Sequence, residues 1–172
     1  LTVLTFMIPL SIGHAALVLV GHAMGAGQPA EARRAALVGL AVGMAVAALV
    51  SLGLGFGAER LAAAYTPDPQ VRAVATGLIG IVAFYHLVDA LQAVVVNVLR
   101  GYKKTTVPML VYAFSLWGVG LAGGYLLGLT DFLGPARGAA GFWIAATLSV
   151  LLAGGVVLAY FLRISRVRAA NE

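Results

Sequence analysis

The chain has no cysteine and few charged residues. The first absence excludes disulfides, thiolate chemistry and cysteine-ligated zinc sites. Charged residues make up 10 % of the 172 residues, whereas an ordinary soluble domain has about 25 %. Hydrophobic residues make up 62 %, and the mean hydropathy is +1.00. This composition indicates an integral membrane protein.

Five long apolar stretches make up most of the sequence. Each has at least the ~20 residues that an α-helix needs to cross ~30 Å of hydrocarbon. The alternating ten-residue pattern of a transmembrane barrel strand does not occur. We therefore predict an all-α integral membrane fold with five transmembrane helices, at about 1–24, 35–57, 73–99, 107–129 and 139–164.

Lysines and arginines are concentrated after the first and third stretches and from the end of the fifth stretch onward, whereas the charges of the other two connections cancel. Under the positive-inside rule, the three basic segments face the cytoplasm. We therefore predict a multi-pass protein of the inner (cytoplasmic) membrane whose C-terminus is cytoplasmic. The net charge of +5 follows from this asymmetry, so we expect no nucleic-acid partner. The basic segments contain Arg33 and Arg34, then Arg100, Lys103 and Lys104, and finally Arg163, Arg166 and Arg168.

Asp89 is the only acidic residue in the five stretches. A carboxyl at bilayer depth costs about 2.5–3.5 kcal/mol on insertion scales, which makes it a functional candidate. Tyr85 and Gln92 fall within about a 60° arc of the same helix face, and His86 and Asn97 lie on the adjoining strip. A carboxylate beside a phenol and an amide can hold Na⁺ through oxygen atoms or carry a proton. We predict a cation-coupling site at Asp89, Tyr85 and Gln92.

A structural role is the main alternative for these polar residues. Asp89 can instead act as a pin to a neighbouring helix, since interhelical polar bonds are common and contribute about 0.6–2 kcal/mol. His14, His22 and His86 share no metal-ligand spacing. We expect no metal beyond Na⁺ at Asp89, and no cofactor other than Na⁺ or H⁺ as the coupling ion.

Proline and the aromatic residues add further expectations. Pro9 should bend its helix or free a backbone carbonyl, so it joins His86 and Asn97 as a candidate for the transport pathway. Aromatic residues toward the ends of the stretches are typical of the interfacial belt. We expect this position for Trp117, Trp143, Tyr125 and Phe142.

Several glycine-containing patches occur in a characteristic order, at 7–15, 20–27, 90–103, 115–128 and 138–143. Together they resemble the multidrug and toxic compound extrusion (MATE) transporters of the NorM type. Members of that family have twelve helices in two six-helix lobes. The resemblance implies that residues 1–172 are a partial C-terminal lobe and that the five helices correspond to helices eight to twelve.

The resemblance also implies a function. Such transporters are antiporters that expel organic cations while Na⁺ or H⁺ flows inward, so we expect a cation-coupled exporter of multiple drugs. It assigns Asp89, with Tyr85 beside it, to the cation site of the C-terminal lobe. Because Leu1 is not a methionine, we expect a fragment that lacks the N-terminal lobe and the seventh helix. Those parts, membrane lipid and small organic cations are the expected partners.

Other functions remain as alternatives. A flippase for lipid-linked precursors would be expected to need basic residues along its cavity, and Arg163, at the end of the fifth stretch, is the single basic residue in the stretches. An embedded enzyme would need a nucleophile with a base. Ser11 and His14, one turn apart, are the nearest approach, and we expect no enzyme. A non-transporting scaffold or truncated product is the remaining alternative.

Overall fold

The computed structural model describes residues 2–132 and 134–169, which are largely helical and contain no strand. Within them, five segments are long and apolar enough to cross a membrane, which confirms the predicted fold class. The elements are α1 (Thr2–Gly25), α2 (Pro29–Tyr65), α3 (Pro69–Gly101), α4 (Thr106–Phe114), the π-helix η1 (Ser115–Ala122), α5 (Gly123–Leu129) and α6 (Ala139–Ala169).

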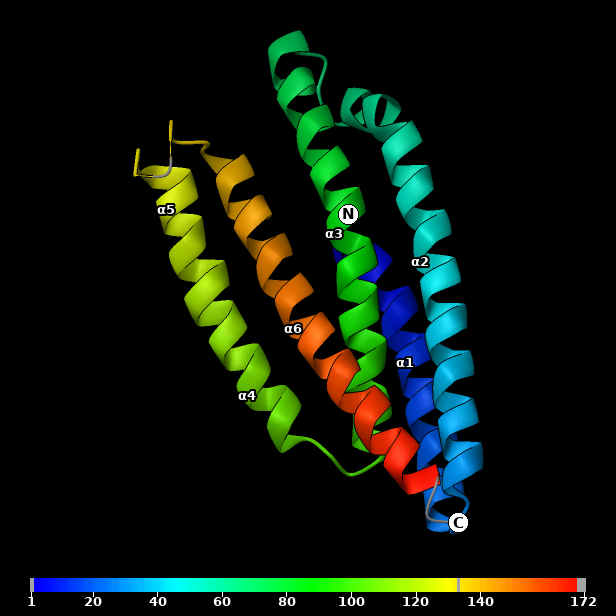
Figure 1. Ribbon diagram of the computed structural model, residues 1–172. Coiled ribbons are helices and arrows are strands. Elements are labelled where there is room, and N and C mark those ends of the chain that lie inside the picture. The colour runs from blue at the N-terminus through cyan, green and yellow to red at the C-terminus, as the bar shows by residue number, and fades with distance from the viewer. Residues whose placement is uncertain (1, 133, 170–172) are drawn as a thin grey trace.

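Short turns set the helix boundaries where the sequence has glycine and proline. Gly27 has a φ of +71° in the turn after α1, and Pro29 begins α2. Asp68 caps α3, because its Oδ1 accepts hydrogen bonds from the backbone N–H groups of Gln70 at 2.8 Å and Val71 at 3.3 Å. These tight connections make successive helices antiparallel in the first half of the chain (Figure 1).

Helix α3 lies at the centre of the bundle, in contact with α1, α2 and α6 (Figure 1). The fourth span, formed by α4, η1 and α5, packs on α6 at the edge. Glycine permits close helix approach: a Cβ on Gly43 would lie 2.9 Å from Val94, and one on Gly39 would lie 2.7 Å from Ala16. In lipid, helices associate through such close packing because no hydrophobic force drives them together.

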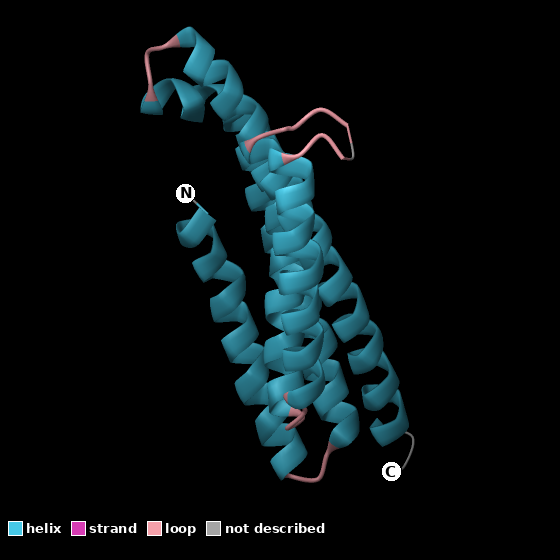
Figure 2. Cartoon of the chain, turned by 90° about the vertical axis from the view of Figure 1, so that its left-hand side faces the viewer, coloured by secondary structure: helices cyan, strands magenta, loops and turns pink. Residues whose placement is uncertain are grey.

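Helices α2 and α3 are longer than a bilayer requires. At 1.5 Å per residue, the 37 residues of α2 and the 33 of α3 extend about 56 and about 50 Å, against about 40–45 Å for a bilayer with its headgroups. Their hairpin projects past the loop between α5 and α6 (Figure 2). The apolar stretches of the sequence are therefore the hydrophobic parts of longer helices.

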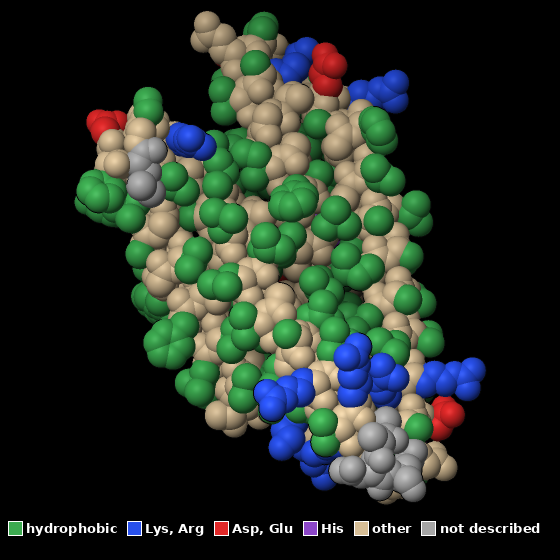
Figure 3. All heavy atoms as spheres, in the orientation of Figure 1, with side chains coloured by type: hydrophobic (Ala, Val, Ile, Leu, Met, Phe, Trp, Pro, Cys, Tyr) green, Lys and Arg blue, Asp and Glu red, His purple; other side chains and the backbone are tan. Residues whose placement is uncertain are grey.

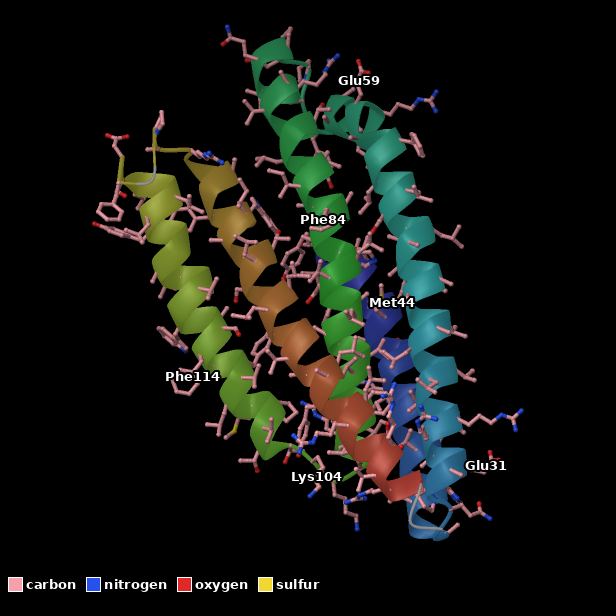
Figure 4. The ribbon with its side chains drawn as sticks, viewed as in Figure 1. Glu31, Met44, Glu59, Phe84, Lys104 and Phe114 are labelled. Carbon is pink, nitrogen blue, oxygen red and sulfur yellow. The ribbon has the colours of Figure 1, made fainter. Side chains whose placement is uncertain are left out.

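Charged side chains divide between the two ends of the bundle (Figure 3). Lysines and arginines gather at the lower end, whereas acidic and basic side chains are mixed at the upper end. Glu59 lies at the upper end, and Glu31 and Lys104 lie at the lower end (Figure 4). The bundle thus has the same charge asymmetry as the connections in the sequence.

The fourth span is not a regular α-helix throughout. Its middle, Ser115–Ala122, is π-helical. Ser149 of α6 donates a hydrogen bond of 2.8 Å to the carbonyl oxygen of Ser115. Gly120 leaves room for this contact, since a Cβ there would lie 3.2 Å from the Ser149 hydroxyl. The apolar pattern of 107–129 predicts the membrane span but not its π-helical middle. The length of an apolar stretch does not show which backbone groups form hydrogen bonds with each other.

Candidate functional site

The polar stripe predicted on the third span lies on α3, the most enclosed helix of the bundle. Asp89 is 9 % exposed and Gln92 is 8 % exposed, while Tyr85 is half-buried. Helix α6 comes close beside the stripe because Gly154 has no side chain: a Cβ there would lie 3.5 Å from the Cβ of Gln92. The structure therefore holds all three predicted site residues in one enclosed stretch of α3.

Asp89 has no hydrogen bond or ion pair with any residue that the structure describes. Its charge acts on two phenols, those of Tyr85 on α3 and Tyr112 on α4. Arg100, the next basic residue along α3, donates to the Oδ1 of Asn97 at 3.4 Å. A buried carboxylate without an ionic partner is costly unless it binds a cation or a proton. The stripe therefore has the chemistry of an exchangeable cation site.

Two grooves open beside the stripe, and Tyr112 lines both. The larger, which we call the aromatic groove, has a volume of about 680 Å³ and reaches Tyr85. The smaller, the polar groove, has a volume of about 450 Å³ and reaches Gln92. The aromatic groove is lined by Tyr85, Tyr112, Leu116, Trp117, Gly120, Leu121, Ala139, Phe142, Trp143, Ala146 and Val150. The polar groove is lined by Gln92, Val96, Arg100, Lys104, Thr105, Thr106, Pro108, Met109 and Tyr112.

Tyr112 lies beside the candidate site and was not predicted from the sequence. The sequence shows only that Tyr112 is a phenol inside an otherwise apolar stretch. Its position in the sequence does not predict which residues it contacts, because the rotation of a membrane helix about its axis depends on packing. In the structure, α4 turns Tyr112 toward the stripe, where the two grooves meet.

Aromatic rings form a wall of the larger groove. The ring of Trp143 meets that of Tyr85 edge-on, with centroids 5.5 Å apart and an interplanar angle of 78°. The interfacial position expected for Trp117 was wrong, because Trp117 lies midway along the fourth span and lines the groove. Phe142 and Trp143 lie near the start of α6 and also line it. The interfacial position of Tyr125 stays a prediction.

The three pathway candidates do not line either groove. Pro9 is buried in α1, which stays helical on both sides of it. Asn97 packs on α1, where a Cβ on Gly13 would lie 2.9 Å from its Nδ2, and it donates to the Ala93 carbonyl at 2.9 Å. His86 is 3 % exposed, and its Nε2 has no partner in the described part of the chain. Their pathway roles stay predictions.

A cation at Asp89 would take oxygen ligands. The carboxylate, the phenols of Tyr85 and Tyr112 and the amide of Gln92 all offer oxygen, the ligand atom that hard cations prefer. No cluster of three or more histidine, aspartate or glutamate side chains that could hold a metal ion occurs in the described residues. With a single negative charge, the site suits a monovalent cation or a proton.

Comparison with known proteins gives the family. The profile described as MatE matches residues 1–126, well over half of the chain. The chain belongs to the MatE family. The resemblance to MATE transporters that the sequence motifs carry is thus confirmed.

Relatives of this MatE chain match it over most of its length. It is 42 % identical over 175 residues to the "Probable multidrug resistance protein NorM" of Aromatoleum aromaticum, a match covering 99 % of the chain and 37 % of the relative. It is 45 % identical over 140 residues to the "Multidrug resistance protein PmpM" of Pseudomonas aeruginosa, covering 81 % of the chain and 29 % of the relative. The chain therefore spans about a third of the length of these relatives.

A solved structure has the same fold. The crystal structure of the eukaryotic MATE transporter AtDTX14 matches 99 % of this chain with a TM-score of 0.84 and 20 % sequence identity. The match covers 38 % of that chain. The five-helix arrangement is therefore an arrangement found within a MATE transporter.

Proposed function

We propose that this MatE chain is part of a cation-coupled antiporter, in which inward flow of Na⁺ or H⁺ drives the export of organic cations. The observation that carries the proposal is Asp89, a buried carboxylate on the central helix with no ionic partner among the described residues. The aromatic and polar grooves lie on either side of it along α3. The names of the relatives as multidrug resistance proteins support drugs as the exported compounds.

Asp89 provides the charge for the coupling ion. For Na⁺, the phenol oxygens of Tyr85 and Tyr112 and the amide oxygen of Gln92 replace part of the water shell. For H⁺, the carboxylate alone is the acceptor. Either ion neutralises the carboxylate, which reduces the cost of keeping it at bilayer depth.

The aromatic groove provides the place for an organic cation. Aromatic rings attract cations by about 0.5–2 kcal/mol, and Trp117, Trp143 and Tyr112 present such rings along the groove. The same negative charge of Asp89 attracts the drug cation and the coupling ion. Binding of one therefore weakens binding of the other by an equal factor, which is the coupling that antiport requires.

The basic lower end of the bundle faces the cytoplasm, with the C-terminus, and the protein lies in the inner membrane. The five helices correspond to helices eight to twelve of a two-lobe transporter. An N-terminal lobe and a seventh helix complete the path, because substrate sites in such transporters lie between repeats. A lipid-precursor flippase is less favoured, since Arg100 and Lys104 line only the smaller polar groove and no described lysine or arginine lines the aromatic groove.

Replacement of Asp89 tests this function in the complete gene product. Asp89→Asn keeps the shape of the side chain and removes its charge. We expect normal membrane insertion, loss of ethidium export from a pump-deficient host, and no response to a Na⁺ or pH gradient.

Asp131→Asn is the matched control. Asp131 is an exposed loop residue whose carboxylate accepts a hydrogen bond from the backbone N–H of Ala136 at 3.1 Å. This variant should export ethidium at the parental rate. Parental export by Asp89→Asn, with an unchanged dependence on the ion gradient, would show that Asp89 is only a structural pin.

A further inference from the structure

The buried residue Tyr102 has a hydroxyl group without a partner among the residues that the structure describes. Tyr102 directly follows α3 at the basic end of the bundle and is 1 % exposed. Its ring packs against Phe161 of α6, with centroids 6.0 Å apart. Its hydroxyl oxygen is buried and makes no hydrogen bond with the described residues. Such orphan groups are rare in folded proteins and call for an explanation.

Two arginines from different helices converge on this tyrosine. The guanidinium of Arg168, in the last turn of α6, lies 5.8 Å from the centre of the Tyr102 ring. Arg33, in the first turns of α2, has a buried Nε that also lacks a partner among the described residues. Burial raises the pKa of Tyr102, and the positive charges of Arg168 and Arg33 act against that rise. The positive charges of both arginines therefore act on Tyr102.

The described residues offer these arginines no acidic partner. The acidic residue that the structure describes at this end, Glu31, lies 3.8 Å from Arg34, in the single ion pair of the described residues. Arg33 and Arg168 are both partly exposed, so an anion can reach them from the surface. A donor hydroxyl near two guanidinium groups that have no acidic partner among the described residues is an arrangement that suits a phosphate oxygen.

We propose that Tyr102, Arg33 and Arg168 bind the phosphate of an anionic phospholipid headgroup. Basic residues at the ends of transmembrane helices attract anionic lipid headgroups. The position favours a lipid over free phosphate, because Leu37 and Val38 follow Arg33 by about one turn on α2 and are 37 % and 56 % exposed. An acyl chain can therefore run along α2 while the headgroup stays at the arginines. The site is separate from Asp89 and does not depend on the transport proposal.

Lipid binding to the purified complete gene product in detergent tests this site. The probe is fluorescent phosphatidylglycerol, displaced by unlabelled lipid. We expect Arg33→Gln with Arg168→Gln to weaken its binding by roughly 25-fold, about fivefold for each basic residue removed. Tyr102→Phe keeps the ring packing and should weaken binding by about twofold to tenfold through the lost hydroxyl.

The control variant removes two positive charges at other positions of the basic end of the bundle. Arg34→Gln with Arg163→Gln replaces two exposed arginines and should weaken binding less than about threefold if the site is local. Equal weakening by the two double variants would overturn the proposal, because it would indicate diffuse attraction to the basic end. If the glutamine pair does not fold, Arg33→Lys with Arg168→Lys keeps the charge but loses the planar fork, and parental affinity in that variant would also overturn it.

Two further probes identify the source of the phosphate. Phosphatidylcholine, which is zwitterionic, should displace labelled phosphatidylglycerol at least tenfold less well than unlabelled phosphatidylglycerol. Inorganic phosphate should displace it only at far higher concentration. Displacement by inorganic phosphate at the same concentration as the lipid would exclude the lipid as the specific ligand.

Discussion

Gly141 is a point of close approach between α6 and the fourth span. A Cβ on Gly141 would lie 2.5 Å from the carbonyl oxygen of Leu127 and 2.7 Å from the backbone nitrogen of Gly128. Both are backbone atoms, so no side-chain rotation relieves the overlap. Ordinary van der Waals contact begins at 3.4 Å, so the distance of 2.5 Å from this Cβ to the Leu127 oxygen is about 0.9 Å too short. Gly141→Ala must therefore push α5 and α6 apart.

This overlap should cost stability. Overpacking of a close contact costs about 1–3 kcal/mol, so we expect the free energy of unfolding of Gly141→Ala to fall by that amount. Gly155, on the same helix, is exposed, and a Cβ there would have nothing within 4 Å. Gly155→Ala should instead raise the free energy of unfolding by about 0.4–1 kcal/mol, because alanine lowers the conformational entropy of the unfolded chain. The two variants should thus change stability in opposite directions.

Titration with SDS in mixed micelles measures both changes in the complete gene product, with helical circular dichroism as the signal. The parental protein and the two variants should share one transition shape and differ in midpoint. If Gly141→Ala unfolds at the same SDS fraction as Gly155→Ala, the close approach of α5 and α6 is not as the structure describes it.

Three further predictions concern the π-helix, the aromatic wall and the topology. Ser149→Ala removes the hydrogen bond to η1 and should lower the free energy of unfolding by about 0.6–1.7 kcal/mol in the same titration. Trp143→Leu removes the edge-on contact with Tyr85 and should cost about 0.5–1.5 kcal/mol beyond the lost area, most of which Trp143→Phe should retain. A fluorescent or enzymatic reporter fused after Lys104 should read cytoplasmic, and one in 66–70 should read external.

Each of these has a clear contrary result. Unchanged stability of the Ser149 variant would mean that the interhelical bond is replaced by another partner. Equal loss in the leucine and phenylalanine variants of Trp143 would mean that ring geometry is unimportant there. An external reading after Lys104 would reverse the proposed orientation of the whole bundle.

The sequence alone determined the spans and the exceptional residue among them. The linear sequence shows directly how long an apolar stretch is and where a charge lies within it. The bilayer acts on both directly, through its thickness and through the cost of burying a charge. Five spans, one basic end and the isolated Asp89 were predictable for this reason.

Tertiary structure decided which side chains meet. A membrane helix is apolar on every side, so hydrophobic periodicity does not show which face turns inward. The meeting of Tyr112 with the stripe, the place of Trp117 in a groove and the π-helix that Ser149 contacts all depend on how each helix is rotated. Glycine contacts such as those of Gly43 with the Val94 side chain and of Gly141 with the Leu127 backbone help to fix that rotation, because a side chain at either glycine would overlap the neighbouring helix.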